Sequence, residues 1–400
     1  MIKESLGCAP AVLLTVFLSA SSPESDFEVM PELKLVEVAC VNVSELPAFT
    51  HETCAQLADN VEQGLGEFSE LTGGVVEPPQ VRPRLLPGTV YIDDAREIRC
   101  INYNNATPAQ VGRITAMVNK ITNVALEKVR IDSGQTGLVV AANGTPDLCR
   151  REPPLNLTER CPDTESRRAF LGGRALHHVM KMPAVFTFAA PGQSELELSL
   201  ARHERGHLGI GTARLGHDYA LCNRDGDRLP SRIEREHAGL GVDIHARKAS
   251  IMGYSPHAPD LYIAPPHLAN LGLIDEDRIV TPEDSGTVTL SDIHQTGPAV
   301  LQVQLTNSAI KKAIAPAASQ ADLSVDAYVL WISKIPGSAE TGVYATPTLE
   351  TLRGNEDAPI LLVQRVGVGE KIDIADGPRV NSIGGNKNAV TIDLQLADAR

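Results

Sequence analysis

A short polar run near the middle of the 400-residue chain constrains its fold more than any other feature. It spans residues 203–207 and reads H-E-R-G-H, so two histidines stand four positions apart. Leu196 and Leu200 extend the same spacing upstream, and Ser194–Glu197 has the pattern of a helix-starting capping box. The run therefore predicts a helix whose inner face changes from leucine to histidine, so that both rings can reach one metal ion.

The run matches the H-E-x-x-H pattern of catalytic zinc sites. Zinc prefers neutral imidazole ligands, and a catalytic site leaves one coordination position to water. His203 and His207 are therefore the predicted ligands of one zinc ion. Glu204 stands beside the first of them, where it can take a proton from water and later deliver it to a leaving amine. The alternative is a surface helix with two solvated histidines, and the leucine face argues against it.

Two features downstream of the helix indicate which kind of zinc site this is. His217 follows, and the string Ser250-Ile251-Met252-Gly253-Tyr254 comes later. Together they resemble the metzincin zinc peptidases, in which a third histidine and a methionine-containing turn follow H-E-x-x-H. The resemblance implies that His217 is the third zinc ligand and that Met252 lies beneath the metal. It also implies that Tyr254 stabilises the oxyanion.

Within the metzincins, the segment 261–274 is most similar to the gametolysin family. The motifs that carry the resemblance lie between Ala184 and Ile274, and the remainder resembles that family only in texture. The turn before the third histidine departs from the pattern. Metzincins have five residues between the second and third histidines, whereas nine residues, 208–216, precede His217 here. Either four residues are inserted in the turn, or another residue is the third ligand.

Other ligand sets stay open on the sequence alone. His237 is the competing histidine for the third position. A thermolysin-like site would instead use a downstream glutamate, for which Glu234 and Glu236 are available, although the usual sequence context of that site is missing. The string 223–227 has oxygen ligands at a spacing that could suit Ca²⁺ but lacks the following acidic ligand, so we interpret it as a turn.

Composition and the N-terminus bear on location and partners. The net charge of −14 argues against nucleic acid or an anionic membrane surface as a partner. The apolar stretch Ala9–Leu18 follows Lys3 and precedes small residues, as in an export signal, and it is too short to span a membrane. We therefore expect a secreted or periplasmic protein that acts on a protein or peptide and does not insert into the membrane.

Cysteine usage agrees with export. Removal of the signal would remove Cys8 and leave an even number of cysteines, which most simply form three disulfides of unknown connectivity. The six that remain are Cys40, Cys54, Cys100, Cys149, Cys161 and Cys222.

The whole pattern predicts an α+β fold. We expect a metzincin-like zinc protease domain, made of a twisted mixed sheet and the active-site helix, followed by an all-β, sandwich-like C-terminal domain. The predicted divisions are a signal peptide at 1–21, a propeptide or first part of the protease at 22–88, a catalytic domain at 89–275 and the β domain at 276–400. Short alternating segments separated by turn residues indicate the last of these.

Local signals predict several elements. Leu33–Val43 reads as a strand, and His51–Thr72 and Thr107–Val129 read as helices, the second with a capping box. Proline-rich Glu77–Pro87 reads as a linker. Val185–Ala189 reads as an edge strand on which an extended substrate could pair.

The expected function is that of a secreted zinc metalloendopeptidase acting on extracellular or cell-wall proteins. Two alternatives of other classes remain. One is an inactive zincin-fold binding or adhesion protein, suggested by the long turn after His207. The other is a zinc hydrolase, of gluzincin type or acting on a non-peptide amide.

Overall fold

The structure is a computed structural model, and it describes residues 33–99, 107–129, 131, 135–143, 173–175, 184–189, 201–207, 215–223, 229–237, 239–243, 250–253, 262–292, 295–353, 355 and 358–397. Within these residues the chain is a mixture of helices and strands, and the strands form three sheets. The predicted α+β composition is confirmed. The predicted signal segment, 1–21, lies outside the described residues.

The elements have the following bounds. The strands are β1 (Leu35–Val43), β2 (Gln80–Val90), β3 (Thr136–Asn143), β4 (Gly173–Ala175), β5 (Ala184–Ala189), β6 (Asp218–Asn223), β7 (Arg232–Ile233), β8 (Leu240–Asp243), β9 (Ile279–Val280), β10 (Gly286–Ser291), β11 (Val300–Gln304), β12 (Tyr328–Lys334), β13 (Thr341–Pro347), β14 (Ile360–Val366), β15 (Lys371–Ile374), β16 (Arg379–Gly385) and β17 (Ala389–Gln395). The helices are α1 (His51–Leu71), α2 (Ala95–Arg99), α3 (Pro108–Lys128), α6 (Pro265–Asn270), α7 (Ser308–Gln320) and α8 (Leu349–Arg353), with 3-10 turns η3 (Glu276–Arg278) and η4 (Val325–Ala327).

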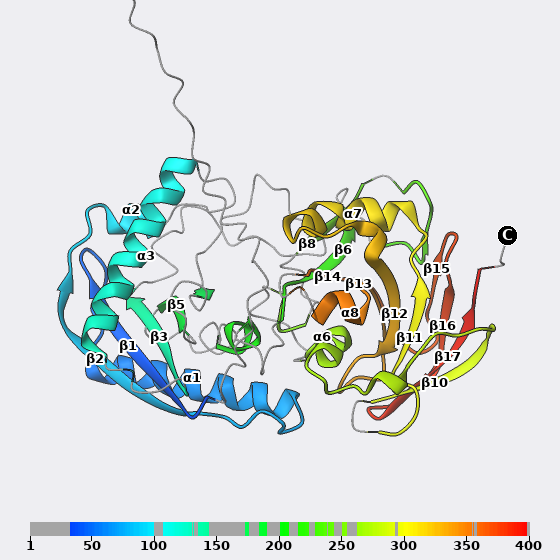
Figure 1. Ribbon diagram of the computed structural model, residues 1–400, viewed down its shortest axis with the longest axis horizontal. Coiled ribbons are helices and arrows are strands. Elements are labelled where there is room, and N and C mark those ends of the chain that lie inside the picture. Colours follow the sequence, from blue (N-terminus) through cyan, green and yellow to red (C-terminus); the bar gives the residue numbers. More distant parts are fainter. Residues whose placement is uncertain are drawn as a thin grey trace, which may run out of the picture.

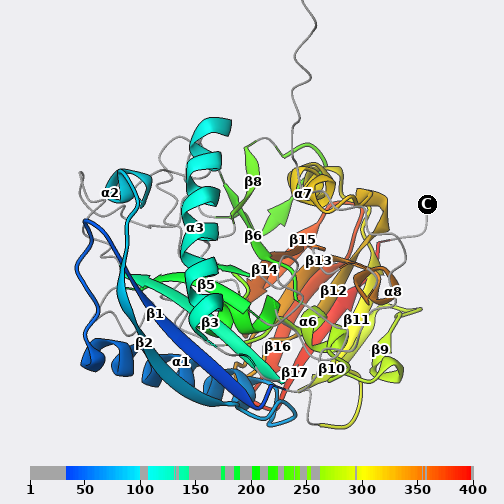
Figure 2. The ribbon, with the colours of Figure 1, turned by 60° about the vertical axis from the view of Figure 1, so that its left-hand side comes forward.

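The N-terminal sheet has the order β2-β1-β3-β5-β4. Its first four strands run parallel, and β4 pairs antiparallel with β5. Parallel strands need crossover connections, and helices supply them here. Figure 2 shows α1 and α3 on opposite faces of this sheet. Such a sheet is apolar on both faces, as β1 illustrates: Val36 and Val38 belong to the core under α1, and Ala39 and Val41 to the core under α3.

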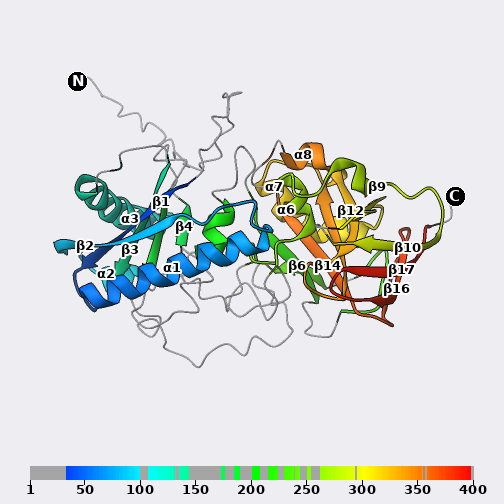
Figure 3. The same ribbon diagram turned by 90° about the horizontal axis from the view of Figure 1, so that it is seen from below.

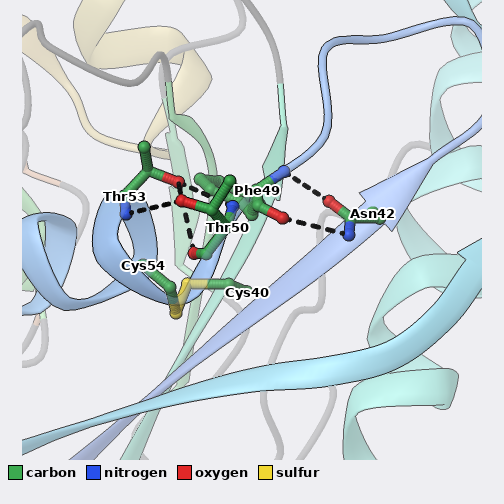
Figure 4. The surroundings of a disulfide bond; sticks show 6 residues. All are labelled: Cys40, Asn42, Phe49, Thr50, Thr53 and Cys54. Atoms are coloured by element: carbon green, nitrogen blue, oxygen red, sulfur yellow. Dashed lines mark hydrogen bonds between the residues drawn. A yellow bond between two sulfur atoms is a disulfide. The ribbon is translucent and has the colours of Figure 1, made fainter.

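Both long helices begin as the sequence predicts. Thr107 accepts from the backbone N–H of Gln110, whose side chain accepts from the Thr107 N–H, which makes the capping box. Thr50 and Thr53 form the corresponding box at the start of α1. A disulfide joins Cys40 on β1 to Cys54 in the first turn of α1 (Figure 4).

The disulfide prediction is met in one described pair. Cys40 and Cys54 are bonded to each other, and both are buried. Cys222 on β6 is also disulfide-bonded, to a partner outside the described residues. The remaining predicted cysteines, Cys100, Cys149 and Cys161, lie outside the described residues.

The linker prediction for Glu77–Pro87 is wrong, because most of this segment is strand β2. The strand lies at the edge of the sheet and pairs only with β1 among the described strands. An edge strand tolerates proline, since one row of its backbone groups needs no ladder partner. Pro83 stands opposite Val38 in this pairing. Strands β1 and β2 therefore belong to the same sheet as β3 and β5.

The predicted edge strand Val185–Ala189 is a strand, β5, but not an edge. It lies between β3 and β4, and the short antiparallel β4 occupies the edge. The three residues of β4 are too few to show a strand period, so β4 could not be predicted from the sequence.

The C-terminal part contains two sheets (Figures 1 and 3). One has the order β8-β6-β14-β13-β12-β11-β9, and the other has the order β10-β17-β16-β15-β7. One cluster of buried side chains draws on both sheets, with Leu330 and Val343 from the first and Val380 and Ile392 from the second. The segments predicted as strands from sequence alternation are strands β10, β11, β12, β14 and β17.

The prediction that 276–400 is all-β is wrong, because the 13-residue helix α7 lies within it. Asn307 caps the helix by accepting from the N–H of Ile310, and Ile310 and Ile314 share its buried face. Pro316 within the helix weakens the helical pattern in the sequence. Strand pairing also crosses the predicted boundary at 275, since β6 pairs with β14 and β7 with β15.

None of the helices in the described part of the chain combines the length and hydrophobicity needed to cross a lipid bilayer.

Candidate metal centre

The H-E-x-x-H run lies on a helix, as predicted. Residues 201–207 are helical, and we call this segment the motif helix. It lies between the N-terminal sheet and the C-terminal sheets, beside the C-terminal part of α1 (Figures 1 and 3). The upstream leucines of the predicted face, Leu196 and Leu200, are outside the described residues.

Three histidines come together at this helix. One ring nitrogen from each of His203, His207 and His217 lies within 4.8 Å of the others. The ring centroids of His203 and His207 are 4.6 Å apart, and that of His217 is 5.4 Å from the first and 4.6 Å from the second. His203 is buried, and the other two are half-buried. The cluster can bind a metal ion, and among the described residues no other group of histidine, cysteine and acidic side chains does so.

Backbone carbonyls fix the protonation of two of the rings. Nδ1 of His203 lies 3.0 Å from the carbonyl oxygen of Ile251, and Nδ1 of His207 lies 2.7 Å from that of Leu215. A carbonyl oxygen only accepts, so each Nδ1 carries a hydrogen, and in the neutral ring Nε2 then keeps its lone pair. The two Nε2 atoms are 3.0 Å apart. Two lone pairs that face each other at this distance fit a shared cation, which is how histidine ligands are oriented in metal sites.

After the motif helix, the chain comes back to the end of that helix at Leu215. The N–H of Leu215 donates to the carbonyl of Gly206 at 3.2 Å, and the Leu215 carbonyl accepts from His207. These two hydrogen bonds hold Leu215 beside the end of the motif helix, however many residues separate Leu215 from His207. His217 follows two residues later and joins the cluster. The insertion that the sequence implied is therefore compatible with His217 as the third histidine.

Strand β6 holds the third histidine from the other side. His217 immediately precedes β6, and its carbonyl accepts from the N–H of Ile360 on β14 at 3.2 Å. Since β6 and β14 pair in parallel, the position of His217 depends on a strand more than 140 residues away in sequence.

The predicted methionine turn packs directly against the motif helix. Met252 is completely buried. A Cβ atom added at Gly206 would lie 2.2 Å from Sδ of Met252 and 3.4 Å from the side chain of Leu215. Only glycine at position 206 therefore lets Met252 approach the helix so closely. The same turn supplies the Ile251 carbonyl that orients His203, so it supports the cluster in two ways.

Glu204 is buried beside the histidines. It is 3% exposed, and its Oε2 has no hydrogen-bond partner within the described part of the chain. Burial raises the pKa of Glu204 to about 8. A buried carboxylate without compensation is costly, and a cation on the adjacent histidines would favour its charged form. The carboxyl group of Glu204 is thus buried on the motif helix, next in sequence to His203.

Two arginines of the motif helix dock it on α1. Arg202 forms an ion pair with Glu67, and Arg205 stacks over Phe68 at 5.5 Å from its guanidinium carbon to the ring centroid. Both arginines are buried, and burial lowers the pKa of Arg205 to about 10. The helix is therefore fixed between α1 on one side and the methionine turn on the other.

The alternative ligands lie elsewhere. His237 is described but does not belong to the histidine cluster. Glu234 and Glu236 are exposed on the segment around β7, and Glu234 pairs with Arg232 at 2.7 Å. Tyr254 lies outside the described residues, and so does most of the predicted turn at 223–227.

Several residues of the site were not singled out from the sequence. Gly206 stands inside the motif, and its role becomes visible only from the contact with Met252. Asp218, next to the third histidine, is buried and contacts Ser250 and His267. Arg202 lies off the predicted inner face of the helix, so the spacing did not indicate its burial against Glu67.

Comparison with known proteins adds little. No family model matches the sequence, and no curated protein matches it. Crystal structures of OgpA from Akkermansia muciniphila are similar in part. The wild-type protein is 11% identical, with 95% of this chain and 99% of that chain covered and a TM-score of 0.32. A catalytically inactive form in complex with an O-glycopeptide, glycodrosocin, is 10% identical, with 94% and 86% covered and a TM-score of 0.31. Likeness at this level carries no argument about the present chain.

Proposed function

We propose that this protein is a zinc-dependent peptidase in which His203, His207 and His217 hold one zinc ion. The observation that carries the proposal is the convergence of the three rings, with two of them oriented by backbone carbonyls. Three nitrogen ligands with a free fourth position are the ligand set of catalytic zinc rather than structural zinc. Zinc, when bound, supplies a Lewis acid that polarises a carbonyl and brings the pKa of water to about 7.

The chain's own residues supply the proton chemistry. Glu204 is the predicted general base and then general acid, because it neighbours the cluster, is buried and leaves one carboxylate oxygen available at the site. The close contact between Met252 and Gly206 keeps the motif helix in place against the methionine turn. Tyr254 stays a proposed oxyanion donor on the strength of the metzincin resemblance alone.

The peptidase class and the metzincin type are inferred from the H-E-x-x-H helix, the third histidine and the Ser-Ile-Met-Gly-Tyr string taken together. The proposed substrate is an extended segment of an extracellular protein. Since β5 lies inside the sheet, the proposed pairing edge moves to β4, the edge strand next to β5; β2 is the opposite edge. Secretion remains a proposal from the N-terminal sequence.

The test uses the full chain expressed with its export signal and purified without added metal. Zinc content is measured by mass spectrometry, and hydrolysis of casein is followed with and without a chelator. We expect about one zinc ion per chain, hydrolysis that the chelator abolishes and its recovery on adding zinc. Zinc binding without hydrolysis of any protein would favour the inactive binding protein, and absence of zinc would refute the proposal.

A further inference from the structure

The third histidine has no helical turn to place it, so other contacts must define where its ring lies. His203 and His207 are one helical turn apart and keep their separation by helix geometry. His217 precedes β6, and its carbonyl is bonded to Ile360. That bond fixes the backbone on one side only. The next residue, Asp218, adds further contacts.

Asp218 is buried and makes three contacts, one through its backbone N–H and two through its carboxylate oxygens. Its backbone N–H donates to the carbonyl of Met252 at 3.1 Å. Its Oδ2 accepts from the hydroxyl of Ser250, and its Oδ1 lies 2.7 Å from Nε2 of His267. The residue is 2% exposed. These contacts define the position of Asp218 and of the peptide bond that joins it to His217.

The carboxylate of Asp218 also contacts the methionine turn, which orients His203. Ser250 begins the methionine turn, and its Oγ also accepts from the N–H of Met252 at 3.2 Å. Ile251, between these two residues, holds Nδ1 of His203. Asp218 therefore links the segment that carries the third histidine to the turn that orients the first.

His267 anchors this link in the C-terminal core. It is completely buried on α6, a short helix whose six residues are all buried. Two prolines at the first turn, Pro265 and Pro266, fix the start of the helix. Residues of α6 belong to the same buried cluster as Trp331 of β12 and Ile360 of β14. The ring of His267 is thus held by a rigid part of the molecule.

We propose that His267 is a positioning residue of the metal centre, acting through Asp218 on His217 and on the methionine turn. The inference rests on the proposed zinc site and adds to it a residue 50 positions beyond the third histidine. In this proposal, α6 and the C-terminal sheets support the part of the metal centre that contains His217. Loss of the His267 side chain would loosen the third ligand and the turn that orients His203, while the helical spacing of His203 and His207 would stay intact.

A purely stabilising role for the pair is the competing explanation, and the chain offers a matched control. Lys334 and Asp292 form a buried ion pair at 2.7 Å in the C-terminal part, with side-chain exposures of 1% and 15%. Lys334 donates to Asp292 and to the carbonyl of Ile335, and neither member of the ion pair belongs to the histidine cluster. Lys334→Met therefore disturbs a buried pair of similar geometry away from the cluster.

The experiment measures zinc affinity in the full-length protein by competition with a chromophoric chelator, together with the rise in melting temperature on adding zinc. The variants are His267→Leu, His267→Gln, Asp218→Asn and Lys334→Met. We expect His267→Leu and Asp218→Asn to weaken zinc binding about 10- to 100-fold, as loss of contacts that orient metal ligands does. His267→Gln keeps an N–H donor and should recover most of the affinity. Lys334→Met should lower the melting temperature with and without zinc equally.

Cobalt substitution gives a reading independent of activity, because the visible spectrum of Co²⁺ reports coordination geometry. A changed spectrum in His267→Leu and a wild-type spectrum in His267→Gln would support the proposal. Should His267→Leu fail to fold, Asp218→Asn carries the test, since it preserves the shape of the side chain. Wild-type zinc affinity and spectrum in the folded variants would overturn the positioning role while the zinc site stands. A wild-type protein that binds no zinc would overturn both.

Discussion

The motif helix and the strand β6 bring histidines to one point by different means. On the helix, His203 and His207 are placed by the helical repeat, and a backbone carbonyl from outside the helix orients each ring. On the strand side, His217 is placed by a hydrogen bond to Ile360, and Asp218 beside it contacts Met252 and His267. The helix half is local and can be read from spacing. The strand half exists only once the C-terminal sheets have formed.

The difference teaches where such a site is vulnerable. A change on the helix half removes a chemical group and leaves the frame intact. A change in the frame, which consists of the methionine turn, β6, β14 and α6, leaves all three histidines in the chain but alters how they meet. The following substitutions distinguish the loss of a chemical group from a disturbed frame, and their expected effects decrease from the first to the last.

The largest effect is expected from Glu204→Gln, which removes the proposed proton acceptor and nearly preserves shape. The rate of peptide hydrolysis should fall at least about 10²- to 10⁴-fold, the usual contribution of general acid–base catalysis. Zinc content should not change, because Glu204 is not a proposed ligand. Steady-state kinetics and metal analysis of the same sample check both statements. Hydrolysis at the wild-type rate would remove Glu204 from the mechanism.

The next effect tests which histidine completes the cluster. His217→Ala should weaken zinc binding by more than the roughly 10- to 100-fold that loss of an orienting contact costs, because a ligand itself is lost. His237→Ala is the matched control and should bind zinc like the wild type, since His237 lies outside the cluster. Chelator competition measures both. The opposite ranking of the two variants would reassign the third ligand.

The contact between the helix and the methionine turn should have an effect on stability. In Gly206→Ala the new methyl group would fall 2.2 Å from Sδ of Met252, so the methionine must move. Overpacking of this kind costs about 1–3 kcal/mol. Gly112→Ala on α3 is the control, because nothing lies within 4 Å of its added Cβ, and it should be neutral or stabilising by about 0.5–1 kcal/mol. Chemical denaturation of the zinc-free proteins decides, and equal stabilities would show that the methionine yields freely.

The smallest effect concerns the docking of the motif helix on α1. A double-mutant cycle with Arg202→Met and Glu67→Gln should give a coupling free energy on the order of 1 kcal/mol. The exposed pair Arg113 and Glu97, 2.9 Å apart, should give less, about 0.2–1 kcal/mol, because water screens it. A coupling in the first cycle no larger than in the second would mean that the buried pair does not hold the helix.

The sequence predicted the local features of this molecule well. The capped helix α3 and the strand β1 follow from capping residues and from apolar runs, and the helix pair of the site follows from a spacing of four. The prediction failed where pairing partners decide the structure. The proline-rich segment of β2 can form a strand because it lies at the edge of the sheet. The segment of α7 forms a helix despite Pro316 because one of its faces is buried.

The candidate site shows the same division. Two carbonyl acceptors, the Gly206–Met252 contact and the ties of Asp218 all join residues that lie far apart in sequence or whose contact depends on packing. No period or motif marks a carbonyl acceptor, since every residue has one. The family resemblance supplied His217 and Met252, but it did not supply the residues that hold them.

In the proposed site, three histidines from the motif helix and the start of β6 share one zinc ion. X-ray absorption at the zinc edge of the purified wild-type protein reports the ligands of that ion. We expect one zinc ion per chain with three imidazole nitrogens at about 2.0–2.1 Å, and one fewer imidazole in any zinc retained by His217→Ala. Sulfur at about 2.3 Å, or an unchanged imidazole count in that variant, would contradict it.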